Sequence, residues 1–165
     1  MAHDFVAKAD ALQADAKRFL LSPTRWRASR VKTPITWTYL PFTKANKNLV
    51  PEEAGVYAFI VSHDNNHFPG HGFIMYIGIT GANGNGRTLR LRYGDYLREQ
   101  QKNKRPKIHY MLNKYPEDIK FAYSAIPDPA FDLEALELDL NDAILPPVVV
   151  KDFTAEIRQL VKAIA

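Results

Sequence analysis

The chain has 165 residues, 46% of them hydrophobic, which is typical of a single globular domain with one core and excludes a disordered protein. It contains no cysteine, so disulfides, thiol nucleophiles and Cys-ligated metal sites are excluded. No apolar run reaches the roughly 18–20 residues of a transmembrane helix, and the early acidic residues at the N-terminus are not typical of a signal peptide. We therefore expect a soluble cytoplasmic protein with no membrane partner.

The formal net charge of +4 is spread unevenly along the chain. Between Lys17 and Lys47 every charged residue is a lysine or an arginine, and between Arg87 and Lys107 only Asp95 and Glu99 oppose the basic residues. The rest of the chain is net acidic. Two basic blocks of this kind indicate a surface that binds a polyanion, since neutralised phosphates release their counterions. Two solvated surface faces are the alternative.

The first fifty residues predict a helix followed by a basic arm. Apolar residues recur at helical spacing over residues 5–20, so we expect an amphipathic helix that docks on the main body and ends before Pro23. Residues 23–50 are rich in proline, aromatic and basic residues, a composition that disfavours a long helix. We expect an extended arm there, packed on or beside the core. Whether it includes a short strand at residues 35–40 is an open alternative.

The next part predicts a hairpin followed by helices. Two β-rich apolar runs, Val56–Val61 and Phe73–Ile79, are separated by a polar stretch with Pro69-Gly70, a pattern typical of an antiparallel hairpin. A basic helix is expected over residues 88–101 and a shorter one over residues 107–115.

The last part predicts one more strand and two helices. We expect a strand over residues 119–126, an acidic helix over 131–145 and a final helix over 154–165. The fold class is therefore an α/β sandwich of the α+β kind, with a small three-stranded antiparallel sheet flanked by helices. We expect residues 51–165 to form this domain, and residues 1–50 to pack with it into a single compact unit.

Polar side chains occupy strand and helix positions that structure alone would fill with apolar ones. Tyr57 and Tyr76 lie in the two hairpin strands, Arg90 and Arg92 in the basic helix, and Glu134 and Glu137 in the acidic helix. Each has an ordinary structural explanation when taken singly. Their order along the chain makes a functional site worth considering.

The chain resembles the GIY-YIG nuclease family over residues 54–149. The two signature elements of that family are similar to Gly55-Val56-Tyr57 and Tyr76-Ile77-Gly78. The family then has a helix with an arginine followed four residues later by His or Tyr, a pattern that Arg92 and Tyr96 match.

The metal-binding glutamate of that family lies on a later helix, nine residues before a proline. Glu137 has this spacing from Pro146, whereas Glu134 does not. Many members also carry an asparagine shortly after the proline, whereas this chain continues as Pro147-Val148-Val149-Val150.

The resemblance implies a metal-dependent endonuclease that hydrolyses DNA phosphodiester bonds to a 5′-phosphate and a 3′-hydroxyl. Glu137 would bind Mg²⁺ or Mn²⁺, which prefer oxygen ligands, and Arg92 would bind the scissile phosphate. Tyr57 and Tyr76 are both candidates for the general base; we favour Tyr76, with Tyr57 orienting water or phosphate and Tyr96 supporting one of them.

Basic residues near these positions would hold double-stranded DNA. Those on or beside the helix of Arg92 are Arg87, Arg90, Arg98, Lys102, Lys104 and Arg105, and those in the arm are Arg25, Arg27, Arg30 and Lys32. The arm would form a second clamp, or else a basic wrapper around the back of the domain.

The absence of a separate DNA-recognition domain after the core favours a restriction-like or phage-type enzyme. The alternatives are a repair or homing-type nicking nuclease, a nucleic-acid-binding module without catalysis, and an accidental motif match in a domain that binds proteins. The sequence leaves open the target, the preference for DNA or RNA, and the oligomeric state, a dimer included.

Overall fold

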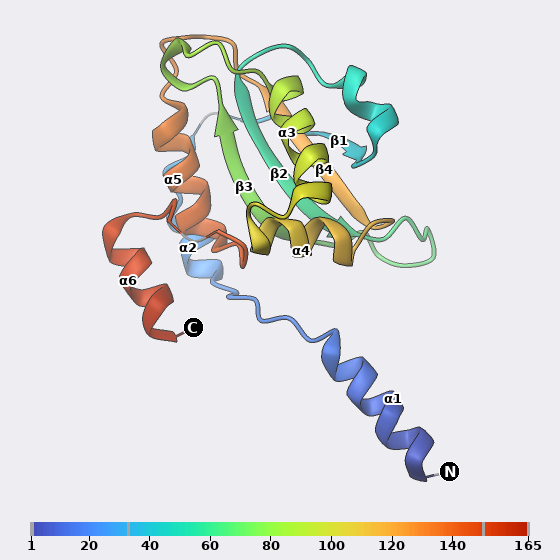
Figure 1. Cartoon of the computed structure of the whole chain (residues 1–165). Coiled ribbons are helices and arrows are strands. Elements are labelled where there is room, and N and C mark those ends of the chain that lie inside the picture. Colours follow the sequence, from blue (N-terminus) through green and yellow to red (C-terminus); the bar gives the residue numbers. More distant parts are fainter. Residues whose placement is uncertain (1, 33, 150, 165) are drawn as a thin grey trace.

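A four-stranded antiparallel sheet runs through the centre of the molecule (Figure 1). Its strands are β1 (Thr38–Pro41), β2 (Gly55–Ser62), β3 (Gly72–Thr80) and β4 (Ile119–Ala125). They lie in the order β1-β4-β2-β3, so β2 is central and β3 forms one edge. The computed structural model describes residues 2–32, 34–149 and 151–164.

The central strand β2 is apolar along most of its length because both of its faces are covered. Successive side chains of a strand point to opposite faces. Tyr57 and Phe59 accordingly belong to the core on one face, and Val56 and Ala58 to the core on the other. In the pairing with β3, Tyr57 lies opposite Gly78.

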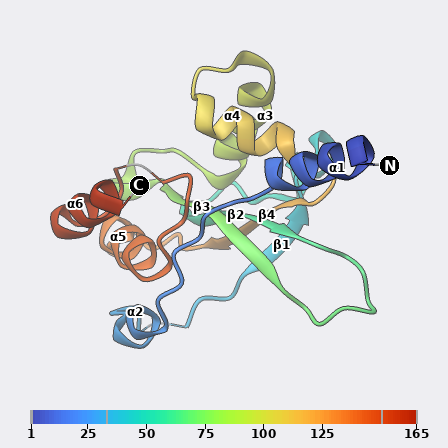
Figure 2. The same ribbon diagram turned by 90° about the horizontal axis from the view of Figure 1, so that it is seen from below.

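Helices pack on both faces of the sheet. The helices α3 (Leu89–Lys102) and α4 (Pro106–Lys114) cover the face of Tyr57, and α5 (Leu133–Ile144) covers the opposite face (Figure 2). Side-chain caps begin two of these helices: Thr88 accepts a hydrogen bond from the backbone of α3, and Asp132 from that of α5. The predicted α+β fold class is confirmed.

The expectation of three strands was one strand short. The fourth strand, β1, lies within the segment expected to be an extended arm, and it pairs with β4. That segment also contains the short helix α2 (Pro23–Ala28), which packs against α5, and the 3-10 helix η1 (Lys44–Leu49). The proline and basic residues disfavour a long helix there, but they permit short elements, and these dock on the sheet and on α5.

The N-terminal helix α1 (Ala2–Ala14) does not dock on the body, contrary to the expectation. Every residue from Asp4 to Ala14 is exposed, and the helix projects away from the sheet (Figure 1). The helices α3, α4 and α5 already pack on the two faces of the sheet.

The last helix, α6 (Ala155–Ile164), packs through Ile157 against Phe153 and Val149. Ala165, where the expected helix ends, lies outside the described residues. No helix within residues 2–32, 34–149 and 151–164 has both the length and the apolar character needed to span a bilayer.

Candidate active site

Three tyrosines from different elements converge beside the edge strand. The hydroxyl oxygens of Tyr57 on β2 and Tyr96 on α3 lie 2.8 Å apart in a buried hydrogen bond. The ring centroid of Tyr76 on β3 lies 6.3 Å from that of Tyr57 and 6.2 Å from that of Tyr96. Tyr57 and Tyr96 are buried, whereas Tyr76 is half-buried. The three tyrosine side chains therefore lie close together, as expected.

The glycine of each signature element has a packing reason. The ring of Tyr57 lies on Gly78, where an added Cβ would come within 2.5 Å of the Tyr57 hydroxyl oxygen. At Gly55 an added Cβ would collide with the backbone carbonyl oxygen of Ser124 on β4. A side chain at position 55 would push β2 away from β4, and one at position 78 would displace the ring of Tyr57.

A hollow of about 560 Å³, here called the tyrosine hollow, opens beside these residues. It brings together Tyr57, Tyr76, Arg92 and Glu137, four of the five residues expected to be catalytic; the fifth, Tyr96, contacts it through Tyr57. The rest of its lining is Ile79, Arg105, Pro106, Lys107, Ile108, Val148, Lys151 and Asp152.

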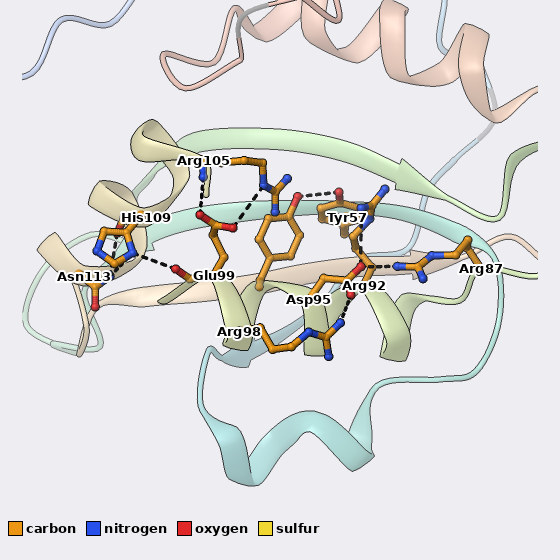
Figure 3. A network of polar contacts seen from close by, with 10 residues as sticks. Tyr57, Arg87, Arg92, Asp95, Arg98, Glu99, Arg105, His109 and Asn113 are labelled. Atoms are coloured by element: carbon orange, nitrogen blue, oxygen red, sulfur yellow. Dashed lines mark hydrogen bonds and ion pairs between the residues drawn. The ribbon is translucent and has the colours of Figure 1, made fainter. Parts of the chain in front are cut away.

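Arg92 has a free donor in this region. Its Nε is buried and makes no hydrogen bond to any of the described residues, and its Nη1 lies 3.8 Å from Asp95 Oδ2. Asp95 also forms ion pairs with Arg87 and Arg98, so three guanidinium groups surround one carboxylate (Figure 3). Asp95 cannot neutralise all three, and the local charge is positive.

Arg105 is fixed at the rim of the tyrosine hollow by neighbours on α3. Its guanidinium lies over the ring of Tyr96, 4.8 Å from the centroid, and its backbone N–H donates to Glu99 Oε1 at 2.6 Å (Figure 3). Glu99 is only 6% exposed, and its carboxylate lies 3.8 Å from Arg105 Nε. A cation–π contact and a buried carboxylate thus hold this arginine in one place.

Glu137 is a weak acid in this setting. Burial and the negative charge of Asp152 raise its pKa from 4.5 to about 7, against opposing effects of the Ile79 backbone and Arg92. The carboxyl group therefore changes its protonation state near neutral pH. A cation bound beside it would favour the ionised form.

The phenol groups of the two candidate general bases, Tyr57 and Tyr76, release their protons only with difficulty. Burial raises the pKa of Tyr57 and of Tyr76 well above the ordinary 10, and the neighbouring phenols add to the rise. Neither phenol ionises near neutral pH unless a further positive charge lowers its pKa.

Basic residues on α3 and directly after it form a second hollow that adjoins the first. This arginine hollow has a volume of about 380 Å³ and shares Arg92 and Arg105 with the tyrosine hollow. The rest of its lining is Asp95, Arg98, Glu99, Lys102 and Lys104.

Arg90 lies differently from the other basic residues of α3. Its Nε donates to the carbonyl oxygen of Val50 at 2.7 Å, and its Nη1 donates to Glu52 at 2.6 Å. Arg90 therefore ties α3 to the loop before β2, and these donors are already occupied.

The arginines of the arm lie elsewhere. Arg25 and Arg30 line a separate hollow of about 330 Å³ beside α5, together with Asp139 and Asp142. Arg27 and Lys32 are exposed. The structure does not bring Arg25 and Arg30 into the tyrosine hollow.

Sequence reasoning missed Lys107, Lys151 and Asp152, which all line the tyrosine hollow. Asp152 and Lys151 follow the segment that resembles a known family, and no motif marks them. Lys107 belongs to the second basic block, and that charge cluster is the one signal that could have found it.

The hollow offers two carboxylates, Glu137 and Asp152, as oxygen ligands for a hard divalent cation. Arg92 and Arg105, which line the same hollow, can bind an anionic group. Comparisons of the chain with protein-family models, with curated proteins and with solved structures gave no match. The functional conclusion rests on the geometry of the hollow.

Proposed function

We propose that this chain is a metal-dependent endonuclease that hydrolyses DNA phosphodiester bonds with a site of the GIY-YIG type. One observation carries the proposal: Tyr57, Tyr76, Arg92 and Glu137, which are far apart in sequence, line a single hollow. The glutamate comes from α5 on one face of the sheet and the arginine from α3 on the other. Core packing gives no reason for these two charged groups to meet.

Arg92 binds the scissile phosphate in this proposal. A guanidinium presents several donors in a plane and stabilises the charge that grows on phosphate oxygens in the transition state. The buried Nε of Arg92, which has no hydrogen-bond partner among the described residues, supports this role. Arg105 and Lys107 add positive charge on the same side of the hollow.

Glu137 would hold Mg²⁺ or Mn²⁺, and its carboxylate suits such hard cations. A divalent cation supplies two things in phosphodiester hydrolysis: it neutralises charge on the phosphoryl oxygens and it lowers the pKa of a bound water. Glu137 must be ionised to serve as a ligand, which its pKa of about 7 permits near neutral pH.

Tyr76 accepts the proton of the attacking water, and Tyr57 orients it. Tyr57 is only 1% exposed, and its hydroxyl group is hydrogen bonded to Tyr96, whereas Tyr76 is half-buried. Tyr76 is therefore the phenol that water reaches more readily. It must ionise first; the hollow's own carboxylates, Glu137 and Asp152, raise its pKa, and a divalent cation held beside them would lower it.

The DNA strand would continue from the tyrosine hollow into the arginine hollow. Both share Arg92 and Arg105, so consecutive phosphates can contact one continuous basic surface. Lys102 and Lys104 are exposed there and are free to contact a backbone without base specificity.

The test is cleavage of supercoiled plasmid with Mg²⁺ or Mn²⁺. The wild-type protein should nick or linearise the plasmid, and Glu137→Ala and Arg92→Ala should each lose about a hundredfold or more in rate. Glu134→Ala is the matched control, because Glu134 lies on the same helix, is exposed and does not line the hollow.

Two results would contradict the proposal. Equal cleavage by wild type and Glu137→Ala removes the metal-binding role of Glu137. DNA binding without cleavage under any divalent cation replaces the nuclease with a nucleic-acid-binding module.

A further inference from the structure

We infer that Asp152 is a second metal-ligating carboxylate, so that Glu137 and Asp152 together hold the divalent cation. This inference rests on the proposed function and names a residue that the sequence pattern does not mark. Asp152 lies after α5, in the segment that leads to α6, yet it lines the same hollow as Glu137.

The chain on both sides of Asp152 is fixed in place. The backbone N–H of Val148 donates to the carbonyl oxygen of Met75 at 3.1 Å, and that of Thr154 donates to Asp142 Oδ1 at 3.1 Å. Phe153, the next residue, is only 2% exposed and packs in a small core of its own. Asp152 is thus held at the hollow by anchored neighbours, as a ligand must be.

Neither carboxylate forms an ion pair within the part of the chain that the structure describes. Glu137 and Asp152 nevertheless share one hollow, where their negative charges repel each other. The guanidinium of Arg92, which also lines the hollow, lies 3.8 Å from Asp95 through Nη1. A divalent cation between two carboxylates relieves this repulsion, and two carboxylates with several waters are a common ligand set for Mg²⁺.

A buried amide without a hydrogen-bond partner in the described part of the chain lies close to Glu137 along α5. Asn141 lies one turn after Glu137 on the same face of α5. It is 0% exposed, and neither Oδ1 nor Nδ2 has a hydrogen-bond partner among the described residues. Buried amides are normally satisfied, if not by protein then by ordered water or an ion. Asn141 does not itself line the tyrosine hollow, so this group marks an unsatisfied polar position behind Glu137.

The experiment measures Mn²⁺ binding directly, by loss of the electron paramagnetic resonance signal of free Mn²⁺ on titration with the full chain. It is run with and without a short DNA duplex that carries a non-cleavable linkage. The variants are Asp152→Asn and Glu137→Gln, with Asp139→Asn as the matched control, because Asp139 lies on the same helix as Glu137 but lines a different hollow. Circular dichroism and the thermal midpoint confirm that each variant is folded.

We expect Asp152→Asn and Glu137→Gln each to weaken Mn²⁺ binding at least about tenfold, and Asp139→Asn to bind as the wild type does. Wild-type affinity in folded Asp152→Asn would overturn this inference alone, because plasmid cleavage that depends on Glu137 would still support the proposed function. No Mn²⁺ binding by the wild type, with or without duplex, would overturn both. A Mn²⁺-dependent rise in thermal midpoint that Asp152→Asn lacks is the supporting second measurement.

Discussion

The ring of Tyr57 lies against the backbone of Gly78, its partner across the β2–β3 pair. The contact is close enough that a Cβ at position 78 would meet both the hydroxyl oxygen of Tyr57, at 2.5 Å, and its Cζ, at 2.7 Å. The two signature elements of the sequence are therefore two halves of one packing unit. One half supplies the phenol and the other supplies the space for it.

Gly78→Ala should lower the free energy of unfolding by about 1–3 kcal/mol, because the buried ring of Tyr57 has no room to move away from the new methyl group. Urea denaturation measures the change. Gly70→Ala is the control, since nothing lies within 4 Å of a Cβ there. Equal stability of the two variants would contradict the close packing.

The buried hydrogen bond between Tyr57 and Tyr96 should appear in a double-mutant cycle. Tyr57→Phe and Tyr96→Phe each leave the other hydroxyl without this partner, so each should cost about 1 kcal/mol or more. The double variant should cost less than the sum of the two. Tyr110→Phe, at an exposed position, should change the free energy of unfolding very little.

Asp95→Asn should separate DNA binding from cleavage. Loss of the Asp95 carboxylate releases Arg87 and Arg98, which can then bind DNA phosphates. The affinity for a non-specific duplex should therefore rise and become more salt-dependent. It also removes the anion nearest to Arg92, which should slow cleavage by about tenfold or more through misplacement of the guanidinium. Fluorescence anisotropy and single-turnover cleavage give the two readouts. A parallel fall in both would contradict a positioning role for Asp95.

Glu137→Gln should stabilise the protein at alkaline pH. Between pH 4.5 and about 7 the folded chain keeps a proton on Glu137 that the unfolded chain has released, so this group's contribution to stability falls as pH rises through that window. The charges around it are those of Asp152 and Glu134, which raise its pKa, and Arg92, which lowers it.

The gain in the free energy of unfolding should therefore be near zero below pH 4 and reach a plateau above pH 8. Urea denaturation across this range, without divalent cations, measures it, with Glu117→Gln, at an exposed position outside the hollow, as the control. A gain that does not vary with pH would show that Glu137 has an ordinary pKa.

Arg90 and Lys102 should behave in opposite ways although both belong to α3. Arg90→Ala should cost about 1–3 kcal/mol of stability, because it leaves the carbonyl of Val50 and the carboxylate of Glu52 without their donor. It should leave DNA affinity unchanged. Lys102→Ala should lower DNA affinity and leave stability unchanged. Loss of binding by folded Arg90→Ala would place Arg90 on the DNA surface after all.

Local patterns predicted most of the fold. The run Val56–Val61 marked β2 because a strand covered on both faces is apolar along its length, and the structure extends it by one residue at each end. The basic helix expected over 88–101 is α3, which Thr88 caps. Periodicity and caps are properties of neighbouring residues, and they can be read from the sequence.

The tertiary position of a segment cannot be read in the same way. The amphipathic pattern over residues 5–20 predicted a helix, but α1 ends at Ala14, and the pattern did not show that α3, α4 and α5 already cover the sheet. Asp152 carries no local signal at all, since its place at the hollow depends on the burial of Phe153 and on contacts with α5 and β3. The nuclease function and the roles of the site residues stay predictions.

The bond between Val148 and Met75 has a consequence beyond the site, because β3 is the outermost strand on its side of the sheet. Outer strands present unpaired backbone groups on which strands of other molecules can assemble into aggregates. The segment after α5 occupies one of these groups on β3. The residue that anchors the segment of Asp152 therefore also covers one backbone group of this outer strand.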